Sequence, residues 1–225
     1  ERLCGPAGKA RRVLNRWAYH HESECMPDRN ADLHGNAPDK SAAALLIIDM
    51  INDLEFDDGE RLEAPAVEAA RRIAAVKRRC REAGIPTIYT NDNFGRWRSD
   101  FRQVVDRVLH DGVRGQRLAE LLTPEPDDYF VLKPKHSAFF ETTLETLLHY
   151  LGAKRLILTG ITGDICVKLT ANDAYMRDYE MLIPTDCTAS IDPQENEHAL
   201  AYCERVLKVK LTTSDEIDLD ALTRA

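Results

Sequence analysis

Residues 156–179 read LILTGITGDICVKLTANDAYMRDY, and they contain the elements from which the rest of the fold follows. An apolar run of strand length ends at Gly160, and Gly163 follows within the next turn. We predict a helix over residues 164–178, with Cys166 in its opening turn. A cysteine at that place is either a small core residue or a nucleophile, and the stretch alone leaves both interpretations open.

The alternation of apolar runs and helical segments continues on both sides of this stretch. Strand-like runs occupy residues 43–49, 85–92, 128–133, 155–160, 180–186 and 208–213. Helical segments occupy residues 65–83, 104–109, 115–122, 142–151, 164–178 and 193–207. Strands that alternate with helices predict βαβ units and a parallel sheet covered by helices. We therefore predict an α/β fold, a three-layer α/β/α Rossmann-like open sheet of about six mostly parallel strands in the order 3-2-1-4-5-6.

Residues 1–42 differ from the remainder of the chain. They mix charges of both signs with glycine and proline, and they show no sustained hydrophobic period. We predict a poorly structured or loosely packed N-terminal arm at residues 1–42 and one folded domain at residues 43–225. The alternative for KARRVLNRW, residues 9–17, is a short basic helix that contacts a partner.

The composition disfavours several function classes. The net charge of −8 argues against a nucleic-acid partner. No apolar run approaches the roughly 20 residues that a membrane helix needs, and no secretory signal is visible. The six cysteines form no CxxC pair. We predict a cytoplasmic protein of a reducing compartment that binds neither nucleic acid nor membrane.

Three polar side chains stand at the ends of predicted strands or the start of a helix: Asp49, Lys133 and Cys166. In the predicted order the first and fourth strands are neighbours, so Asp49 and Cys166 face each other across the crevice at the carboxyl edge of the sheet. Lys133 reaches the crevice from the third strand. A helix N-terminus and a lysine are expected to lower the thiol pKa to about 3.5–7.5. A carboxylate in reach takes the thiol proton and returns it to a leaving group.

Three motifs make the chain resemble the isochorismatase-like cysteine hydrolases, a superfamily that includes nicotinamidases, N-carbamoylsarcosine amidases, ureidoacrylate amidases and isochorismatases. The motifs are LLIIDMINDL at residues 45–54, VLKPKHSAFFETTLETLL at residues 131–148 and LILTGITGDICVKLTANDAYMRDYEMLIPTDCTAS at residues 156–190. They occur in the family's order. Each motif alone is weak, and the three together are specific.

The resemblance implies a catalytic triad in which Asp49 is the base, Lys133 the electrostatic partner and Cys166 the nucleophile. It also implies a non-proline cis peptide bond between Ile161 and Thr162. The implied oxyanion donors are the backbone N–H groups of Thr162 and Cys166.

The chain departs from the family pattern at Gly163, Ile51 and Leu54, which leaves the implied triad intact and changes the surroundings of the substrate pocket. The Asp-x-His…His metal site of nicotinamidases has no counterpart, because no histidine occurs between His34 and His110. We therefore predict no metal and no cofactor, and nicotinamide is disfavoured as the substrate.

Five ring-bearing side chains are candidates for the walls of the substrate pocket: Phe56, Phe94, Trp97, His136 and Phe139. For each phenylalanine and the tryptophan, core packing is an equally good interpretation. The alternative for His136 is a partly exposed structural histidine.

Other residues compete for the catalytic roles. Cys187 also follows a strand, but it lacks the glycine turn and the immediate helix start, so we interpret it as a core residue. Asp53 and Asp92 are weaker candidates for the base. Asp164 precedes Cys166 by two residues, and a carboxylate at the sulfur would raise the thiol pKa. We therefore predict that Asp164 caps the helix and faces away from the sulfur.

These observations favour an enzyme, a cysteine amidohydrolase that cleaves a C–N bond of a small amide or ureido compound through a thioester on Cys166. The first alternative is an isochorismatase-type vinyl-ether hydrolase that acts through Asp49 and does not need the cysteine. The second alternative is a non-catalytic binding protein on the same fold. The resemblance further implies a small-molecule substrate and a homo-oligomer, either a dimer or a tetramer.

Overall fold

The computed structural model describes residues 39–93 and 100–224 of the chain. The strands are β1 (Ala43–Ile48), β2 (Thr87–Asp92), β3 (Tyr129–Lys133), β4 (Arg155–Ile161), β5 (Glu180–Pro184), β6 (Thr188–Ala189) and β7 (Lys210–Thr212). The α-helices are α2 (Gly59–Glu82), α3 (Phe101–His110), α4 (Gln116–Leu121), α5 (Leu144–Leu151), α6 (Lys168–Tyr175), α7 (Pro193–Leu207) and α8 (Leu219–Thr223).

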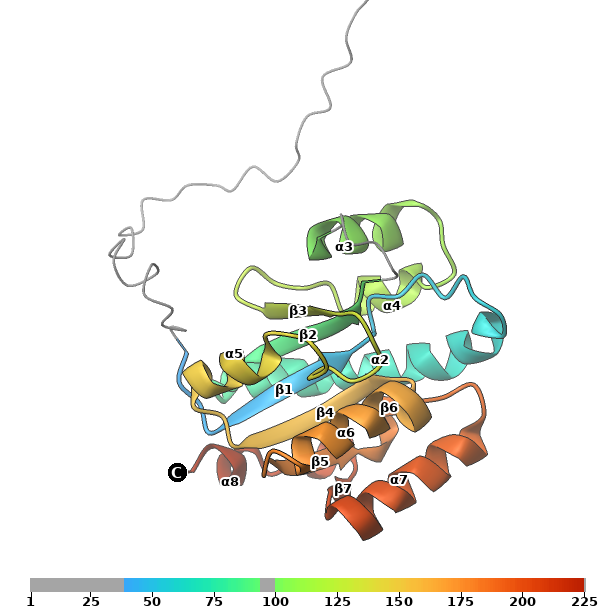
Figure 1. Ribbon diagram of the computed structural model, residues 1–225. Coiled ribbons are helices and arrows are strands. Elements are labelled where there is room, and N and C mark those ends of the chain that lie inside the picture. The colour runs from blue at the N-terminus through green and yellow to red at the C-terminus, as the bar shows by residue number, and fades with distance from the viewer. Residues whose placement is uncertain (1–38, 94–99, 225) are drawn as a thin grey trace, which may run out of the picture. The chain divides into compact units, whose positions relative to one another are not determined.

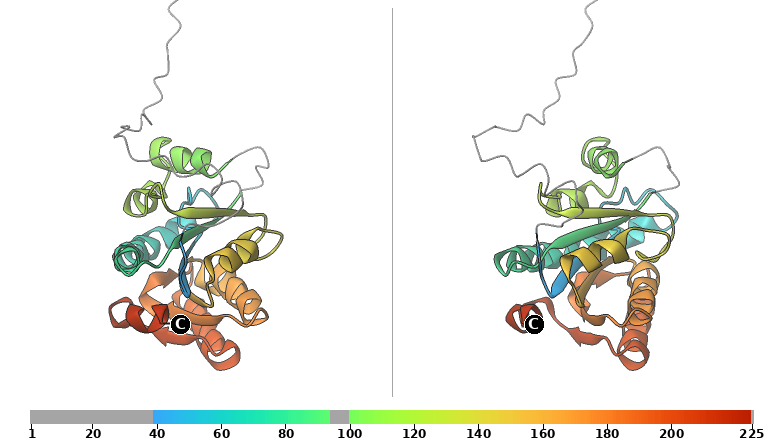
Figure 2. Two further views of the ribbon diagram at one scale, coloured as in Figure 1. Left: turned by 90° about the vertical axis from the view of Figure 1, so that its left-hand side faces the viewer. Right: turned by 60° about the vertical axis from the view of Figure 1, so that its left-hand side comes forward.

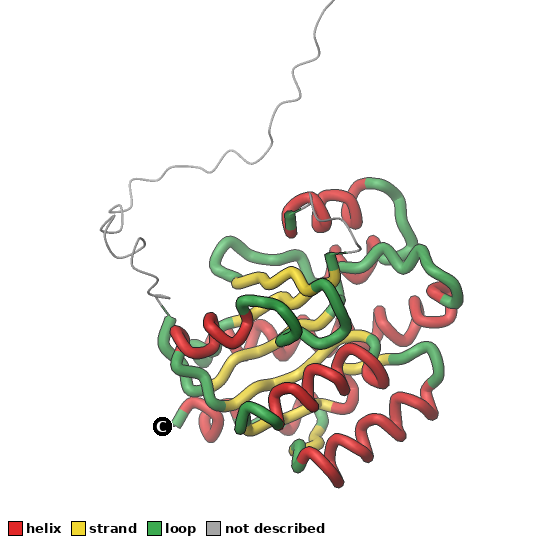
Figure 3. The backbone as a smooth tube through the Cα atoms, in the orientation of Figure 1, coloured by secondary structure: helices red, strands yellow, loops and turns green. Residues whose placement is uncertain are grey.

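The strands form one parallel sheet in the order β3-β2-β1-β4-β5-β7, and the short β6 pairs with β4 (Figure 1). Since β7 is the sixth strand of the sequence prediction, the predicted order 3-2-1-4-5-6 is confirmed. Figure 3 shows the strands side by side between the helices. The strand β6 was not predicted, because its two residues are too few to give a hydrophobic period.

The central strand β1 is buried on both faces because its alternate residues enter two different cores. Leu45 and Ile47 pack in a core with residues of α2, α4 and α8. Leu46 and Ile48 pack in a second core with residues of α5, α6 and α7. These helices therefore form the outer two layers around the sheet (Figure 2). Burial of each of these side chains contributes about 1.5–3 kcal/mol.

Helix α2 begins one and a half turns before the predicted start at residue 65. Its buried stripe includes Leu62 and Ala66 and continues through Ile73 and Val76, so the packing surface requires the earlier turns. Proline is typical of the first turn of a helix, and the prediction placed Pro65 there. In the structure Pro65 lies inside the helix and is exposed.

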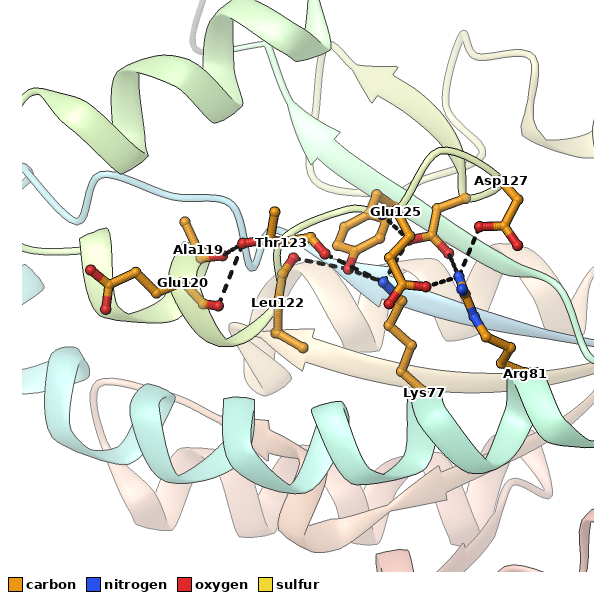
Figure 4. Close-up of polar contacts among 10 residues, drawn as sticks. Lys77, Arg81, Ala119, Glu120, Leu122, Thr123, Glu125 and Asp127 are labelled. Carbon is orange, nitrogen blue, oxygen red and sulfur yellow. Dashed lines mark hydrogen bonds and ion pairs between the residues drawn. The ribbon is translucent and has the colours of Figure 1, made fainter. Parts of the chain in front are cut away.

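A polar cluster joins α2 to the segment between α4 and β3 (Figure 4). The Lys77 Nζ atom lies 2.5 Å from Asp128 Oδ2 and 3.1 Å from the Tyr89 hydroxyl. Arg81 forms ion pairs with Glu125 and with neighbouring carboxylates of the same segment. The Lys77 and Asp128 side chains are buried, and Arg81 gives Asp128 a second cation at 3.5 Å. The cluster lies at the amino end of β3, away from the carboxyl end where Lys133 stands.

The N-terminal arm predicted at residues 1–42 lies outside the described residues, apart from residues 39–42. The folded domain predicted to begin at residue 43 opens with β1, which starts at Ala43. Within residues 39–93 and 100–224, no helix is long and apolar enough to cross a membrane.

Candidate active site

The carboxyl ends of neighbouring strands bring the three predicted residues together. Asp49 follows β1 directly, Lys133 is the last residue of β3, and Cys166 lies in the turn after β4. In the sheet β1 lies between β2 and β4, and β2 lies next to β3. Residues that are far apart in the sequence therefore converge at one edge, where ligands bind in open α/β sheets.

Asp49 and Lys133 form a buried ion pair. The Lys133 Nζ atom lies 2.7 Å from Asp49 Oδ2, and the Lys133 side chain is fully buried. The other carboxylate oxygen, Asp49 Oδ1, accepts a hydrogen bond of 2.7 Å from the backbone N–H of Asp92. Asp49 has a φ of 54°, a left-handed conformation that aspartate adopts more readily than most residues. Both oxygens of Asp49 are thus held, one by a group of β2 and the other by a group of β3.

The Cys166 sulfur lies against polar side chains although it is nearly buried, with 9% of the residue exposed. Lys133 Nζ is 3.8 Å from the sulfur, and His136 Nδ1 is 3.7 Å from it. Asp49 and the backbone N–H of Thr162 also act on the pKa of the thiol: Asp49 raises it and the Thr162 N–H lowers it. Cys166 also belongs to the core that β1 shares with α5, α6 and α7, so its sulfur lies at the boundary between apolar packing and polar groups.

The turn that holds Cys166 is wider than a regular helix. Gly163–Val167 form a single π-helical turn, in which the Val167 N–H bonds the Thr162 carbonyl at 3.1 Å. Helix α6 follows and ends at Tyr175, so the regular helix predicted over residues 164–178 is wrong at both ends. Single π-helical turns occur frequently at functional sites.

The peptide bond between Ile161 and Thr162 is cis, as the resemblance implies. Gly160, just before it, has a φ of 119°, and a side chain there would lie 2.0 Å from the Ile48 carbonyl oxygen. Glycine therefore permits the close approach of β4 and β1 beside Asp49.

The pKa of Cys166 is raised, which contradicts the expected lowering. Burial raises the pKa of the thiol to about 12, the Asp49 charge adds to the rise, and the Lys133 ammonium offsets only part of it. Burial likewise raises the pKa of Asp49 above its ordinary value, although Lys133 opposes that shift. Burial alone would lower the pKa of Lys133, but the Asp49 carboxylate raises it above the ordinary value. The resting site therefore holds a neutral thiol next to a base and a cation.

The raised pKa of Cys166 predicts an unusual pH dependence of alkylation. Iodoacetamide reacts with the thiolate, so its rate constant at Cys166 is expected to rise about tenfold per pH unit between about pH 7 and pH 10. A thiol of ordinary pKa, about 8.5, would level off within that range. Mass spectrometry of the peptide that carries Cys166 measures the rate. A plateau below about pH 9 would contradict the raised pKa.

The loop after Lys133 is fastened to the helix after Cys166. Ser137 Oγ donates a hydrogen bond to the Asp173 carboxylate, and the Ala138 N–H donates to Thr170 Oγ1 at 3.0 Å. Thr170 and Asp173 were not among the predicted site residues. They stand four and seven residues after Cys166, a spacing that gives one face in a regular helix, and that spacing was the available signal.

Asp164 does not cap the helix, so that part of its prediction is wrong. No side chain caps the turn after Thr162. The Asp164 N–H donates to Ser190 Oγ at 3.1 Å, while its Oδ1 atom is buried without a partner among the described residues. Ser190 is held in turn by Asn196 at 3.0 Å. The main-chain N–H of Asp164 is thus linked to α7 through the side chains of Ser190 and Asn196, and the Asp164 carboxylate takes no part in that link.

The five predicted pocket residues have different positions. Phe94 and Trp97 lie outside the described residues. Phe56 is exposed in the loop between β1 and α2, and no contact joins it to Cys166. Phe139 is buried in the core against Tyr179, which favours the packing interpretation. His136 alone of the described candidates contacts the sulfur.

The other residues considered for the nucleophile and the base lie in the core or make other contacts. Cys187 is fully buried in the core beside α2, and burial raises the pKa of its thiol well above the ordinary value. The Asp53 carboxylate pairs with Arg107 at 3.0 Å. Asp92 reaches Asp49 through its backbone N–H. Across the described ranges, no group of three or more histidine, cysteine or acidic side chains is arranged to hold a metal ion.

Comparison with known proteins gives matches over most of the chain. The family model described as "Isochorismatase domain" matches residues 43–216. The chain is 44% identical over 178 residues to an uncharacterized isochorismatase family protein, YaaI, of Bacillus subtilis (strain 168), across 79% of this chain and 97% of that protein. It is 32% identical over 170 residues to the isochorismatase of the same organism, across 73% of this chain and 54% of that protein. The crystal structure of N-carbamoylsarcosine amidase from Thermoplasma acidophilum matches with a TM-score of 0.59 at 26% identity, across 78% of this chain and 98% of that one.

Proposed function

The chain belongs to the isochorismatase family of hydrolases, and from this premise we propose that it is a cysteine hydrolase that cleaves a C–N bond of a small amide or ureido compound. The observation that carries the proposal is the position of the Lys133 ammonium. It lies 2.7 Å from the Asp49 carboxylate and 3.8 Å from the Cys166 sulfur, so a carboxylate, a cation and a thiol lie together at the carboxyl edge of the sheet. A nucleophile next to an oriented base is the signature of covalent catalysis.

In the simplest cycle Asp49 carries every proton. It takes the thiol proton as the sulfur attacks the carbonyl carbon, and it passes that proton to the nitrogen as the C–N bond breaks. Water then gives a proton to Asp49 and adds to the thioester carbon. The C–S bond breaks, and the sulfur recovers the proton. The products are ammonia or an amine and a carboxylic acid, or a carbamic acid where a ureido compound keeps a nitrogen on the carbonyl carbon.

The other groups stabilise charge during these steps. Lys133 opposes the rise in the Asp49 pKa and so keeps more of the carboxylate in the basic form. The backbone N–H of Thr162 lowers the pKa of Cys166, so it stabilises negative charge at the sulfur, and we assign it the further role of donor to the oxyanion of an acyl group bound to Cys166. These roles of Asp49, Lys133, Cys166 and Thr162 belong to the proposal.

A vinyl-ether hydrolase is the second candidate. The 32% identity to an isochorismatase favours it, and the match covers about half the length of that protein. In such an enzyme Asp49 protonates the substrate and Cys166 is dispensable. The polar contacts of the sulfur favour the amidohydrolase, because a dispensable cysteine would not require them.

The test is an ammonia-release screen over primary amides and ureido compounds, joined to acid quenching and mass spectrometry. We expect turnover of at least one compound and an acyl group on the peptide that carries Cys166. Turnover of an isochorismate-like vinyl ether, without ammonia release and without an adduct, would favour the second candidate and reject the first.

The proposal also includes where the enzyme acts and in which oligomeric state. A thiol nucleophile requires reducing conditions, and Cys80, Cys166, Cys187 and Cys203 of the described residues are free thiols. We therefore propose a cytoplasmic location, and from the family resemblance a homo-oligomer that acts on a small molecule.

A further inference from the structure

The sulfur of Cys166 has acid–base neighbours of two kinds. Asp49 and Lys133 are buried and bonded to each other. His136 is exposed, and its Nδ1 atom lies 3.7 Å from the sulfur. Of the side chains that contact the sulfur within the described ranges, His136 is thus the one that can exchange protons directly with solvent.

The backbone around His136 is held on both sides. The preceding residue, Lys135, accepts a hydrogen bond of 3.2 Å at its carbonyl oxygen from the Lys133 ammonium. The following residue, Ser137, is bonded to Asp173 of α6 and is buried. On a loose loop, a contact between a histidine and the sulfur would be accidental. Here the hydrogen bonds of the residues before and after His136 hold the loop, so they keep His136 against the nucleophile.

Asp49 is poorly placed to serve the departing nitrogen as well as the thiol. Its Oδ2 atom faces the Lys133 ammonium and its Oδ1 atom accepts from the Asp92 N–H, so both oxygens are engaged on the buried side of the site. In the cycle in which Asp49 carries every proton, the proton must move from the Asp49–Lys133 pair to the departing nitrogen. That nitrogen belongs to a substrate whose carbonyl carbon is bonded to the sulfur. A donor that contacts the sulfur from the exposed side shortens that path.

We propose that His136 is a catalytic residue that donates the proton to the departing nitrogen, a role that rests on the proposed amidohydrolase function. The S–C bond forms as Asp49 takes the thiol proton. The C–N bond breaks as the His136 imidazolium gives its proton to the nitrogen, and the imidazole becomes neutral. Water then loses a proton to His136 as it adds to the thioester carbon. The C–S bond breaks, and Asp49 returns its proton to the sulfur, so every proton is accounted for.

The test separates leaving groups that need a proton from those that do not. An amide nitrogen must be protonated to depart, whereas p-nitrophenolate leaves as an anion. For His136→Phe, kcat/KM is expected to fall about 10²-fold for the primary amide that the ammonia-release screen selects. For the p-nitrophenyl ester of the same acid it is expected to change less than about threefold. The change His149→Phe, at an exposed histidine of α5, is the matched control and leaves both rates unchanged.

If His136 had only a structural role, its replacement would lower kcat/KM equally for the amide and the ester. Equal losses for amide and ester, or no loss for the amide, would overturn the proposal, and His136→Asn repeats the comparison with a smaller side chain. Ester turnover also shows that each variant is folded. If the unaltered enzyme forms no acyl adduct on Cys166, the amidohydrolase proposal itself fails. An adduct together with equal losses rejects only the role of His136.

Discussion

Replacement of Cys166 with alanine is expected to lower kcat/KM for the amide substrate by at least about 10³-fold. The change removes the atom that forms the thioester, and no other described thiol contacts the Asp49–Lys133 pair. The residual rate would come from binding and from the backbone N–H groups alone. Steady-state ammonia release measures the loss, and mass spectrometry is expected to find no acyl adduct on the variant.

Two other buried cysteines provide controls for that result. Cys203→Ala alters a buried cysteine of α7, and Cys187→Ala removes the rival nucleophile from the core. Both variants are expected to keep kcat/KM within about threefold and to lose about 1 kcal/mol of unfolding free energy. Full activity of Cys166→Ala would reject thioester chemistry. If Asp49→Asn were then inactive, the vinyl-ether mechanism would be favoured.

Much of the fold could be predicted because the hydrophobic pattern of each segment and the rules for connecting strands indicate the same parallel sheet. The run at residues 43–49 has no polar face, which is typical of a strand covered on both sides, and β1 is buried on both faces. Once strands and helices alternate, the connection rules leave few possible strand orders. The carboxyl ends of the parallel strands then lie at one edge of the sheet. Asp49, Lys133 and Cys166 were therefore expected at one crevice before any distance was known.

The electrostatics of the site could not be predicted in the same way. A helix start and a lysine suggested a low thiol pKa, but desolvation depends on how tightly the surroundings pack. Lys133 also lies closer to Asp49 than to the sulfur, and the Asp49 charge itself raises the pKa of Cys166. The sign of the shift follows from these three-dimensional neighbours. The π-helical turn was equally invisible, because its sequence has the spacing of an ordinary helix.

Replacement of Lys133 with methionine is expected to damage both stability and activity. Asp49 would keep its buried carboxylate without the ammonium partner at 2.7 Å, which costs about 3–5 kcal/mol of unfolding free energy. The folded-state pKa of Asp49 would rise further, so the loss should shrink as the pH falls, where the carboxyl group is neutral and needs no partner. We also expect kcat/KM to fall at least about 10²-fold, because a protonated Asp49 cannot accept the thiol proton. Urea denaturation and ammonia release measure the two effects.

The double variant Asp49→Asn/Lys133→Met separates the structural role of the pair from its chemical role. Without either charge, most of the lost stability should return, since a buried pair can often be replaced by neutral groups at little cost. Activity should stay as low as in Lys133→Met, because the base is absent. Lys77→Met is the matched control: it breaks the buried Lys77–Asp128 pair and should lower stability, by less than Lys133→Met because Arg81 still pairs with Asp128, yet leave kcat/KM of the folded enzyme unchanged. If the double variant regained activity with its stability, Asp49 and Lys133 would be scaffold residues, and the proton transfers assigned to Asp49 would be refuted.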